Sequence, residues 1–529
     1  SVVSAGVCVV GMMMFKISMP RSFVLLYAGA LTALCSALRL LYRELRRARM
    51  RSHGGIGQKR TMLIGGGQAG SMVLREFQFS AHSENNVVCI IDDDRSKHGS
   101  YMRGVKIVGG RDDILHMAEK YGVEEIVLAI PSASRRERLD ILDICHLTGC
   151  SLRTLPGLYQ LANGEVSIQS IKHVDIEDLL GRDTVKTDLN EVKAYVQDKV
   201  VLVTGGGGSI GSELCRQIAK YAPKKIIIFD IYENNAYTLK QALDRHYFGS
   251  PEIIIRIGSV RDKARLREVF EEFHPSSVFH AAAHKHVPLM EDSPFEAIKN
   301  NTLGTYNTAE CANEYKVSHF VLLSTDKAVN PTNVMGATKR TCELIIQHFA
   351  KISKDTTFAA VRFGNVLGSN GSVIPLFKEQ LENGGPLTVT HPDITRYFMT
   401  IPEAAQLVVQ AGGLAKGGEI FVLNMGEPVK ILSLAEKLIK LSGFEPYVDI
   451  DIQFTGLRPG EKLYEELVLQ SEKDDIHKTQ NDKIYVTSPG DIDDEKLISH
   501  IEKIRSMKPG DSREFLMELV PTYTPDREA

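Results

Sequence analysis

Apolar residues without a charged side chain dominate the first part of the chain. They form two stretches, residues 1–15 and residues 22–38, and the second continues through Leu40 and Leu41. A helix needs about 20 apolar residues to cross a bilayer, a length that the second stretch then reaches. We therefore expect transmembrane helices and a basic juxtamembrane segment within residues 1–52.

Arginines follow the second apolar stretch directly and are opposed only by Glu44. They are Arg39, Arg43, Arg46, Arg47, Arg49 and Arg51. Such a cluster marks the cytoplasmic side of a membrane helix, so we expect everything downstream to be cytoplasmic. The alternative is a buried core helix followed by a solvated basic helix. Because the chain begins with Ser1 rather than Met, we also expect a truncated amino end with further helices before it.

Residues 53–165 change to short apolar strands that alternate with helical segments. This alternation predicts a doubly wound parallel sheet and thus a Rossmann-like accessory domain. Its first strand is followed by Gly65, Gly67 and Gly70, a turn that lets a phosphate approach the start of a helix. That spacing alone is a weak signal, so ligand binding and a structural or regulatory role both remain open. Residues 166–198 then have the polar character of a connector.

The same pattern is clearer in a second unit, residues 199–529. There a strand leads into Gly205, Gly208 and Gly211 in a TGxxGxxG spacing. The first glycine makes the tight turn, the second admits a pyrophosphate, and the third lets helix and strand pack closely. The next strand ends at Asp230, whose carboxylate can bind both ribose hydroxyls and would repel a 2′-phosphate. The spacing therefore predicts a site for NAD rather than NADP.

Composition and charge narrow the class of partner. Lys and Arg number 63 against 66 Asp and Glu, a net charge of −3, which argues against nucleic acid as a main partner. Hydrophobic residues make up 43% of the chain, enough for ordinary globular cores. The eight cysteines show no paired CxxC spacing that would indicate a disulfide framework or a zinc site. His284 and His286 lack a third ligand at a suitable spacing, so we expect no metal.

Residues 322–340 are the most informative segment for chemistry. Thr325, Asp326 and Lys327 follow an apolar strand, and the carboxyl ends of parallel strands are where such sheets bind ligands. Met335 and Lys339 lie four positions apart on the following helix, so they share a face. The segment predicts a reactive cleft beside the nicotinamide.

The second unit resembles extended short-chain dehydrogenase/reductases, in which Ser/Thr, Tyr and Lys in a YxxxK spacing handle the cofactor and the substrate hydroxyl. Here Met335 takes the Tyr position, and a thioether cannot exchange a proton. In this departure the chain is similar to the large membrane-bound nucleotide-sugar 4,6-dehydratases of bacterial polysaccharide synthesis, which carry Met beside a Thr-Asp-Lys triplet. The segments that carry this resemblance are TGGGGSIGSE, AAAHKHVPLME, NNTLGTYN, STDKAVNPTNVMGATKR, RFGNVLGS and GLRPGEKLYEEL.

The resemblance implies a hydro-lyase with bound NAD that converts UDP-N-acetylglucosamine, or another UDP-N-acetylhexosamine, to a 4-keto-6-deoxy sugar. It further implies a homo-oligomer attached to the lipid bilayer of the bacterial inner membrane, with its catalytic domains in the cytoplasm. Two other functions stay open. One is a nucleotide-sugar epimerase acting at C4 or C5, and the other is a non-catalytic, membrane-tethered nucleotide sensor.

Within the implied reaction each residue of the reactive segment has an expected role. Lys327 would remove the C5 proton, and Asp326 would protonate the departing O6, an acid–base pair suited to elimination. Thr325 would hydrogen-bond the C4 hydroxyl or ketone, Lys339 would bind the nicotinamide ribose, and Met335 would line the site.

Lys327 must be neutral for part of the cycle, and we expect burial or nearby Lys339 to lower its pKa. The group that removes the C4 hydroxyl proton stays open, with Asp326 acting through Thr325, or a water, as candidates. The competing interpretation of Asp326 and Lys327 is an ion pair at a strand end.

The remaining expected contacts concern the cofactor and the sugar nucleotide. The expected cofactor-binding residues are Gly205, Gly208, Ser209, Ile210, Gly211, Asp230, Ser259, Val260, Ala281, Ala282, Lys285, Asn301 and Lys339. Asn301 is expected to support the site rather than to take part in chemistry. The expected substrate-binding residues are Lys285, Asn365, Arg396, Arg458 and Glu461. Arginines suit the diphosphate because their planar fork grips phosphate oxygens in two bonds, although solvated loops would also carry them.

Overall fold

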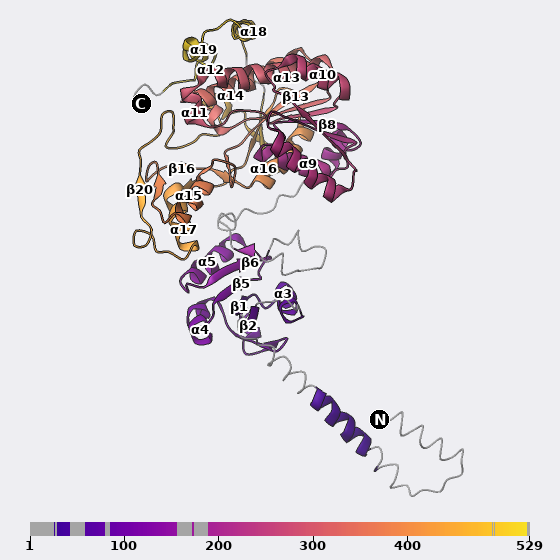
Figure 1. Ribbon diagram of the computed structural model, residues 1–529, viewed down its shortest axis with the longest axis vertical. Helices are drawn as coiled ribbons and strands as arrows, with labels where there is room; N and C mark the ends of the chain where they lie inside the picture. The colour runs from indigo at the N-terminus through magenta and orange to yellow at the C-terminus, as the bar shows by residue number, and fades with distance from the viewer. Residues whose placement is uncertain are drawn as a thin grey trace, which may run out of the picture. The chain divides into compact units, whose positions relative to one another are not determined.

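A computed structural model divides the chain into two compact units, Ser1–Val174 and Asp175–Ala529 (Figure 1). The boundary falls inside the expected connector. The structure describes residues 26, 29–42, 59–79, 85–155, 172–173, 189–488, 490 and 492–525.

The structure does not support the expected spanning helix. Residues 29–42 are helical. Across the described ranges, no helix is both long and apolar enough to cross a membrane. Leucines of this helix are nevertheless exposed, Leu34 at 59% and Leu38 at 56%. The rest of the predicted membrane segment lies outside the described residues.

The first unit is a Rossmann-like α/β domain. Within its described residues the strand order is β3-β4-β2-β1-β5-β6-β7, with parallel pairing from β4 to β6 and antiparallel strands at both edges. The strands are β1 (Lys59–Ile64), β2 (Asn85–Ile91), β3 (Tyr101–Met102), β4 (Val105–Gly109), β5 (Glu125–Leu128), β6 (Ser151–Thr154) and β7 (Lys172–His173). The helices are α3 (Gln68–Phe79), α4 (Ile114–Tyr121) and α5 (Arg135–His146). Leu63, Leu74, Ile90 and Val127 are fully buried between them.

The second unit is built on a larger sheet of the same kind, which agrees with the predicted fold class. Its order in the described residues is β10-β9-β8-β11-β12-β13-β18-β22-β21, parallel from β10 to β18. The last two strands run antiparallel. The strands are β8 (Val200–Thr204), β9 (Lys225–Asp230), β10 (Glu252–Ile257), β11 (Ser277–His280), β12 (His319–Leu323), β13 (Thr357–Arg362), β18 (Ile420–Leu423), β21 (His477–Lys478) and β22 (Ile484–Thr487).

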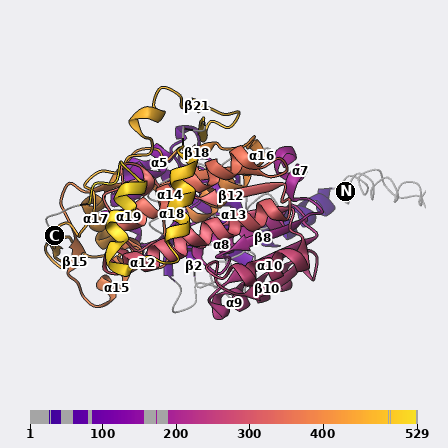
Figure 2. The ribbon, with the colours of Figure 1, turned by 90° about the horizontal axis from the view of Figure 1, so that it is seen from above.

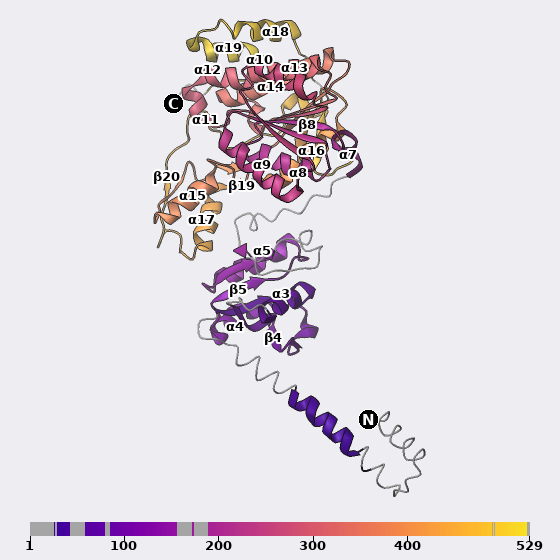
Figure 3. The ribbon, with the colours of Figure 1, turned by 45° about the vertical axis from the view of Figure 1, so that its right-hand side comes forward.

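Helices cover both faces of this sheet and enclose two apolar cores. Figure 2 looks down on the helices of one face, α10 (Lys263–Phe273), α13 (Gly304–Glu314), α14 (Val334–Ile352), α18 (Asp494–Lys503) and α19 (Ser512–Leu519). The other face carries α7 (Leu189–Val196), α8 (Ser209–Ala219), α9 (Glu233–Tyr247) and α16 (Ile401–Leu414), as Figure 3 shows. Phe279 and Phe320 illustrate the division, since they are buried in opposite cores.

Helix α7 belongs to the second unit, although its sequence lies in the expected connector. Val192, Tyr195 and Val196 are buried against the sheet, as their i, i+3, i+4 spacing permits. The Tyr195 hydroxyl donates to the Val409 carbonyl, and Ser277 Oγ donates to the Tyr195 carbonyl at 2.8 Å. The end of the connector is thus part of the folded domain.

Short paired strands beyond the main sheet hold two of the residues expected to bind substrate, Asn365 and Arg396. β14 (Asn365–Val366) pairs with β17 (Phe398–Met399), and β16 (Thr395–Arg396) pairs with β19 (Val429–Lys430). Nearby lie α15 (Val373–Glu382), α17 (Ile431–Leu441) and the pair β15 (Leu387–Val389) and β20 (Ile452–Phe454). These small elements bring Asn365 and Arg396 to the rim of the sheet.

Candidate active site

The glycine turn after β8 is shaped by backbone contacts that exclude side chains. Gly205 has φ +65°, and a Cβ added to it would lie 2.7 Å from Ala282 Cα. A Cβ on Gly211 would lie 2.1 Å from the Gly205 carbonyl oxygen. The first contact sets the tight turn, and the second lets α8 begin directly above the strand.

Asp230 at the end of β9 is anchored but keeps acceptor capacity. Its Oδ2 accepts the Gly207 backbone N–H at 2.8 Å, and its Oδ1 accepts the Tyr232 backbone N–H at 2.8 Å. No cationic side chain among the described residues forms an ion pair with it. A carboxylate has about four lone-pair sites, so acceptors remain for two ribose hydroxyls.

The turn after β1 in the first unit repeats this geometry with one difference. Gly65 has φ +111°, and Asp92 Oδ2 accepts the Gly66 backbone N–H at 2.6 Å. In this unit, however, the Lys97 ammonium lies 3.2 Å from both oxygens of the Asp92 carboxylate. The strand-end acid that is free of cations in the second unit is therefore neutralised in the first.

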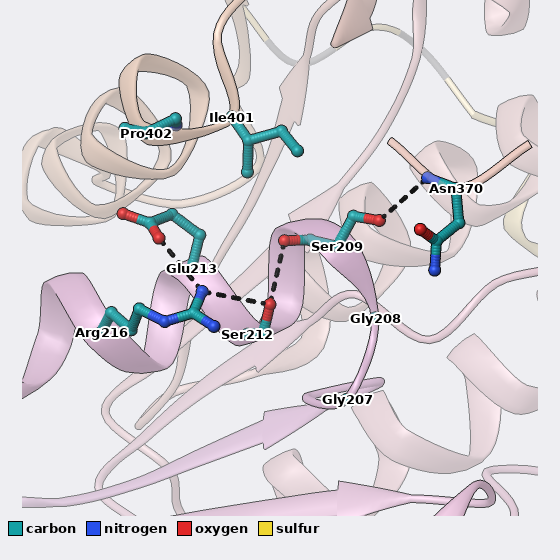
Figure 4. Close-up of a pocket in the computed structure, with 9 residues that line it drawn as sticks. All are labelled: Gly207, Gly208, Ser209, Ser212, Glu213, Arg216, Asn370, Ile401 and Pro402. Atoms are coloured by element: carbon teal, nitrogen blue, oxygen red, sulfur yellow. Dashed lines mark hydrogen bonds and ion pairs between the residues drawn. The ribbon is translucent and has the colours of Figure 1, made fainter. Parts of the chain in front are cut away.

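A pocket of about 340 Å³ opens beside the turn of the second unit (Figure 4). It is lined by Gly207, Gly208, Ser209, Ser212, Glu213, Arg216, Asn370, Ile401 and Pro402. The Asn370 backbone N–H donates to Ser209 Oγ at 3.4 Å, and Arg216 Nη1 donates to Glu213 Oε2 at 3.2 Å. The amino end of α8 presents unpaired backbone N–H groups here, as phosphate binding requires.

Asn301 holds the loop after β11 rather than a ligand. It lies on a π-helical turn, Ile298–Leu303, and is fully buried. Its Oδ1 accepts the His284 backbone N–H at 2.8 Å, while Nδ2 donates to the His284 carbonyl and to Thr338 Oγ1, each at 3.0 Å. Because both ends of the amide are engaged, Asn301 ties the loop after β11 to α14.

Other residues expected at the cofactor follow β10 and β11. Ser259 Oγ accepts the Arg261 backbone N–H at 3.3 Å, and Val260 is buried beneath it. Lys285 Nζ donates to the Asn370 carbonyl at 2.9 Å and to Ser369 Oγ at 3.3 Å. Lys285 thus joins the loop after β11 to the loop that lines the pocket.

Thr325, Asp326, Lys327 and Asn365 meet at the end of β12. Thr325 Oγ1 donates to Asp326 Oδ1 at 2.9 Å, and Lys327 Nζ donates to the same oxygen at 3.0 Å. Lys327 Nζ also donates to Asn365 Oδ1 at 3.0 Å. The Asp326 side chain is fully buried, and its second oxygen has no hydrogen-bond partner among the described residues. The group contains a hydroxyl, a carboxylate and an amine in contact.

The pKa of Lys327 shifts in the direction opposite to the expectation. Burial lowers it, but Asp326 and Glu465 outweigh burial, so the pKa lies above its ordinary value. The expectation considered burial and Lys339 only. It failed because two carboxylates stabilise the charged amine.

Glu465 is a member of this site that the sequence reasoning missed. Its Oε1 lies 3.4 Å from Lys327 Nζ and 3.6 Å from Arg396 Nε. Its side chain is 4% exposed, and Oε2 is buried without a partner in the part of the chain described. It lies in the segment GLRPGEKLYEEL, where no sequence pattern distinguishes it from the neighbouring acidic residues Glu461 and Glu466.

Met335 and Lys339 lie on α14 beneath the triplet. Met335 is 4% exposed and packs into an apolar core, so it lines the site as a non-ionisable side chain. Lys339 is 6% exposed. Burial and the Lys339 cation together lower the pKa of His280 to about 3. An ammonium carries three donors, which suit a ribose hydroxyl.

Arg396 and Arg458, both expected at the diphosphate, share Glu461 as a partner but differ in exposure. Arg396 Nη2 donates to Glu461 Oε1 at 3.1 Å, and the Arg458 backbone N–H donates to Glu461 Oε2 at 3.2 Å. Glu461 is therefore a partner of Arg396, which is 8% exposed. Arg458 itself is exposed.

A buried ion-pair network, also missed from sequence, supports the strand end from below. Arg362 Nη2 donates to Glu343 Oε2 at 2.9 Å, and Arg362 Nη1 donates to Glu472 Oε2 at 2.8 Å. Ser324, directly before Thr325, donates from Oγ to Glu343 Oε1 at 2.6 Å. Burial raises the pKa of Glu343, but Arg362 and Arg340 outweigh burial and hold it at about 2.

These residues fit NAD. The turn admits a pyrophosphate without a blocking side chain, Asp230 has acceptors left for the adenosine ribose, and Lys339 on α14 carries an ammonium suited to a ribose hydroxyl. Across the described residues no group of three or more His, Cys, Asp or Glu side chains could hold a metal ion. Fold and site together define a Rossmann-type enzyme of the short-chain dehydrogenase/reductase class.

Comparison with known proteins identifies the family of the chain. It belongs to the polysaccharide biosynthesis protein family, whose pattern matches residues 201–489. Residues 1–156 match a family described as a CoA-binding domain. The chain is 49% identical to the capsular polysaccharide biosynthesis protein CapD of Staphylococcus aureus over 86% of this chain and 76% of that one.

Two further relatives match the second unit and differ in reaction. A UDP-N-acetylglucosamine 4,6-dehydratase (inverting) of Campylobacter jejuni is 36% identical over 55% of this chain and 83% of its own length. A UDP-glucose 4-epimerase of Rickettsia rickettsii is 38% identical over 52% of this chain and 79% of its own. The chain is thus similar to nucleotide-sugar dehydratases and epimerases alike.

Proposed function

We propose that the protein is an NAD-dependent 4,6-dehydratase of a UDP-N-acetylhexosamine, with UDP-N-acetylglucosamine as substrate and a UDP-4-keto-6-deoxy sugar as product. The observation that carries this proposal is the contact of Thr325, Asp326 and Lys327 at the end of β12. A dehydration needs an acid and a base at neighbouring carbons, and this group supplies both. The similarity to the Campylobacter dehydratase supports the same reaction.

The glycine turn, Asp230 and Lys339 would hold the dinucleotide. The dinucleotide held there would supply a hydride acceptor for C4 of the sugar and the hydride that returns at C6. Thr325 hydrogen-bonds the C4 hydroxyl and relays its proton to Asp326, because the Thr325 hydroxyl already donates to that carboxylate. Asp326 then gives the proton to the departing O6, so water leaves. Lys327, as the neutral amine, takes the C5 proton and later returns a proton to C5.

This proton relay accounts for the missing tyrosine. The proton that leaves O4 is the one that leaves with O6, so Asp326 ends the cycle in its starting state. The buried second oxygen of Asp326, which has no hydrogen-bond partner in the described part of the chain, gives the carboxyl group a free atom for this transfer. Arg396 would bind the diphosphate once it exchanges Glu461 for a phosphate oxygen.

A C4 epimerase is the second candidate, favoured by the similarity to the Rickettsia enzyme. It would use the same ketone but would need no acid at O6. A sensor without turnover would need neither member of the Asp326–Lys327 pair.

The test is NMR of UDP-N-acetylglucosamine incubated with the full chain and NAD in D₂O. We expect loss of one water and solvent deuterium at C5, and an intact C6 hydroxyl in the product would overturn the proposal. Lys327→Ala is expected to abolish elimination. As a matched control, Lys351→Ala removes a lysine near the far end of α14 whose ammonium pairs with Asp494 at 3.3 Å, and elimination should persist.

We also propose that the protein acts at the cytoplasmic face of a bacterial cell membrane. The exposed leucines of residues 29–42 and the arginines after them support this location. Fractionation of cells that express the chain is the test, and recovery entirely in the supernatant would argue against it.

A further inference from the structure

Lys327 lies between two buried carboxylates from distant parts of the chain. Asp326 is its sequence neighbour and binds Nζ at 3.0 Å, while Glu465 approaches to 3.4 Å. The exposed fractions of the two acidic side chains are 0% and 4%, against 18% for Lys327. Asn365 Oδ1 accepts a third contact from the ammonium. Within the part of the chain that the structure describes, Arg396 is the cation that faces this group from another element, at 3.6 Å from Glu465.

The position of Glu465 is fixed by contacts on both sides of it. Lys462 Nζ donates to the Val329 carbonyl at 2.9 Å, and Thr332 Oγ1 donates to the Gly460 carbonyl at 2.9 Å. The Thr395 backbone N–H donates to the Leu463 carbonyl at 3.1 Å. The segment is therefore tied both to the loop that follows Lys327 and to β16.

The acidic neighbours of Glu465 in this segment have other partners. Glu461 accepts from Arg396, and Glu466 accepts from Asn330 Nδ2 at 3.1 Å. Glu466 is 50% exposed, whereas Glu465 Oε2 is buried with no partner among the described residues. In the described ranges, the ion pairs of Glu465 are those with Lys327 and Arg396.

We infer that Glu465 is a positioning residue that sets the protonation state of Lys327 and hence the pH at which C5 is deprotonated. This role rests on the proposed function, in which the neutral amine is the base. A buried carboxylate beside an amine favours the ammonium form. Glu465 therefore raises the pKa of Lys327, so that the neutral amine forms only at a higher pH.

The sign of the effect follows from the charges around the amine. Burial lowers the pKa of Lys327, Asp326 and Glu465 raise it, and Arg396 lowers it. Glu465→Gln removes one negative neighbour and keeps the shape, so the pKa should fall. An opposite charge at this distance moves a pKa by roughly 1 to 3 units, and we expect a decrease of about 1 unit.

The first experiment measures the pKa of Lys327 in the absence of substrate turnover. The full chain is labelled with a trace of acetic anhydride over a pH series, and acetylation of the Lys327 peptide is quantified by mass spectrometry. Only the neutral amine reacts, so the midpoint reports its pKa. We expect the midpoint to fall by about 1 pH unit in Glu465→Gln and to return toward wild type in Glu465→Asp. The matched control Glu466→Gln should leave it in place.

The second experiment follows C5 deuteration against pH in the same variants. The rising limb for Glu465→Gln should move to lower pH by the same amount as the labelling midpoint. An unmoved midpoint in Glu465→Gln, or an equal displacement in Glu466→Gln, would overturn the inference while leaving the dehydratase proposal intact. A displaced midpoint in a protein that does not dehydrate the sugar would instead refute the proposed function and retain the electrostatic role.

Discussion

Glu343→Gln tests the buried ion-pair network beneath the active-site strand. The substitution keeps an acceptor for Ser324 but leaves the Arg362 guanidinium, 0% exposed, without its fully buried counter-charge, so that only Glu472 still pairs with it among the described residues. The Glu343 pKa of about 2, against 4.5 for a free Glu, corresponds to about 3 kcal/mol of stability at neutral pH. Removal of one member of a buried pair costs roughly 3 to 5 kcal/mol, which agrees with that figure.

Hydrogen exchange followed by mass spectrometry measures this loss locally in β13 and α14, independently of the first unit. A loss of about 3 kcal/mol predicts exchange faster by roughly two orders of magnitude at pH 7. Glu314→Gln is the matched control, because its ion pair with Arg267 is about half exposed and should contribute less than about 1 kcal/mol.

The same reasoning fixes a pH dependence. The Glu343 pKa is depressed in the folded state, so its contribution is complete above pH 4.5 and declines as pH falls toward about 2. The difference in exchange between wild type and Glu343→Gln should shrink over that window. Equal exchange rates at pH 7, or a difference that grows on acidification, would refute the assignment.

Two further predictions concern the cofactor. Asp230→Asn should weaken the binding of NAD about 10- to 100-fold, because charged acceptors are lost, and should reduce the preference for NAD over NADP. Titration of the apo protein with both dinucleotides measures the two affinities. An unchanged ratio of these affinities would contradict the role of Asp230. Asn301→Ala should lower the free energy of unfolding by about 2 to 3 kcal/mol, since it removes hydrogen bonds to His284 and Thr338. Thermal unfolding of the variant measures this loss. Unaltered thermal unfolding together with weaker NAD binding would instead make Asn301 a direct ligand of the cofactor.

The predictable parts of this molecule are those encoded over short distances. The glycine turn and Asp230 lie on consecutive elements, so spacing alone placed them together. The triplet at the end of β12 is likewise contiguous. The sequence reasoning missed Glu465 because it reaches Lys327 from a segment far along the chain, and local spacing carries no signal for such contacts.

Two expectations failed for identifiable physical reasons. Helix α7 was assigned to the connector on its polar character, although Val192, Tyr195 and Val196 already had the spacing of a buried face. The direction of the Lys327 pKa was wrong because burial was considered without the acids that burial brings with it. Both expectations were wrong because they considered only the sequence around each residue and not its contacts with distant segments.

Among the described residues, each unit has a glycine turn after its first strand, but only the strand-end carboxylate of the second unit, Asp230, has no cation in contact. Lys97 lies against Asp92, where the second unit leaves the Asp230 carboxylate to backbone donors alone. A ribose with bare hydroxyls would meet an ammonium in the first unit rather than free acceptors. We therefore expect saturation with NAD at one equivalent per chain. The two units thus share a Rossmann-like fold, but we expect only the second to bind the dinucleotide.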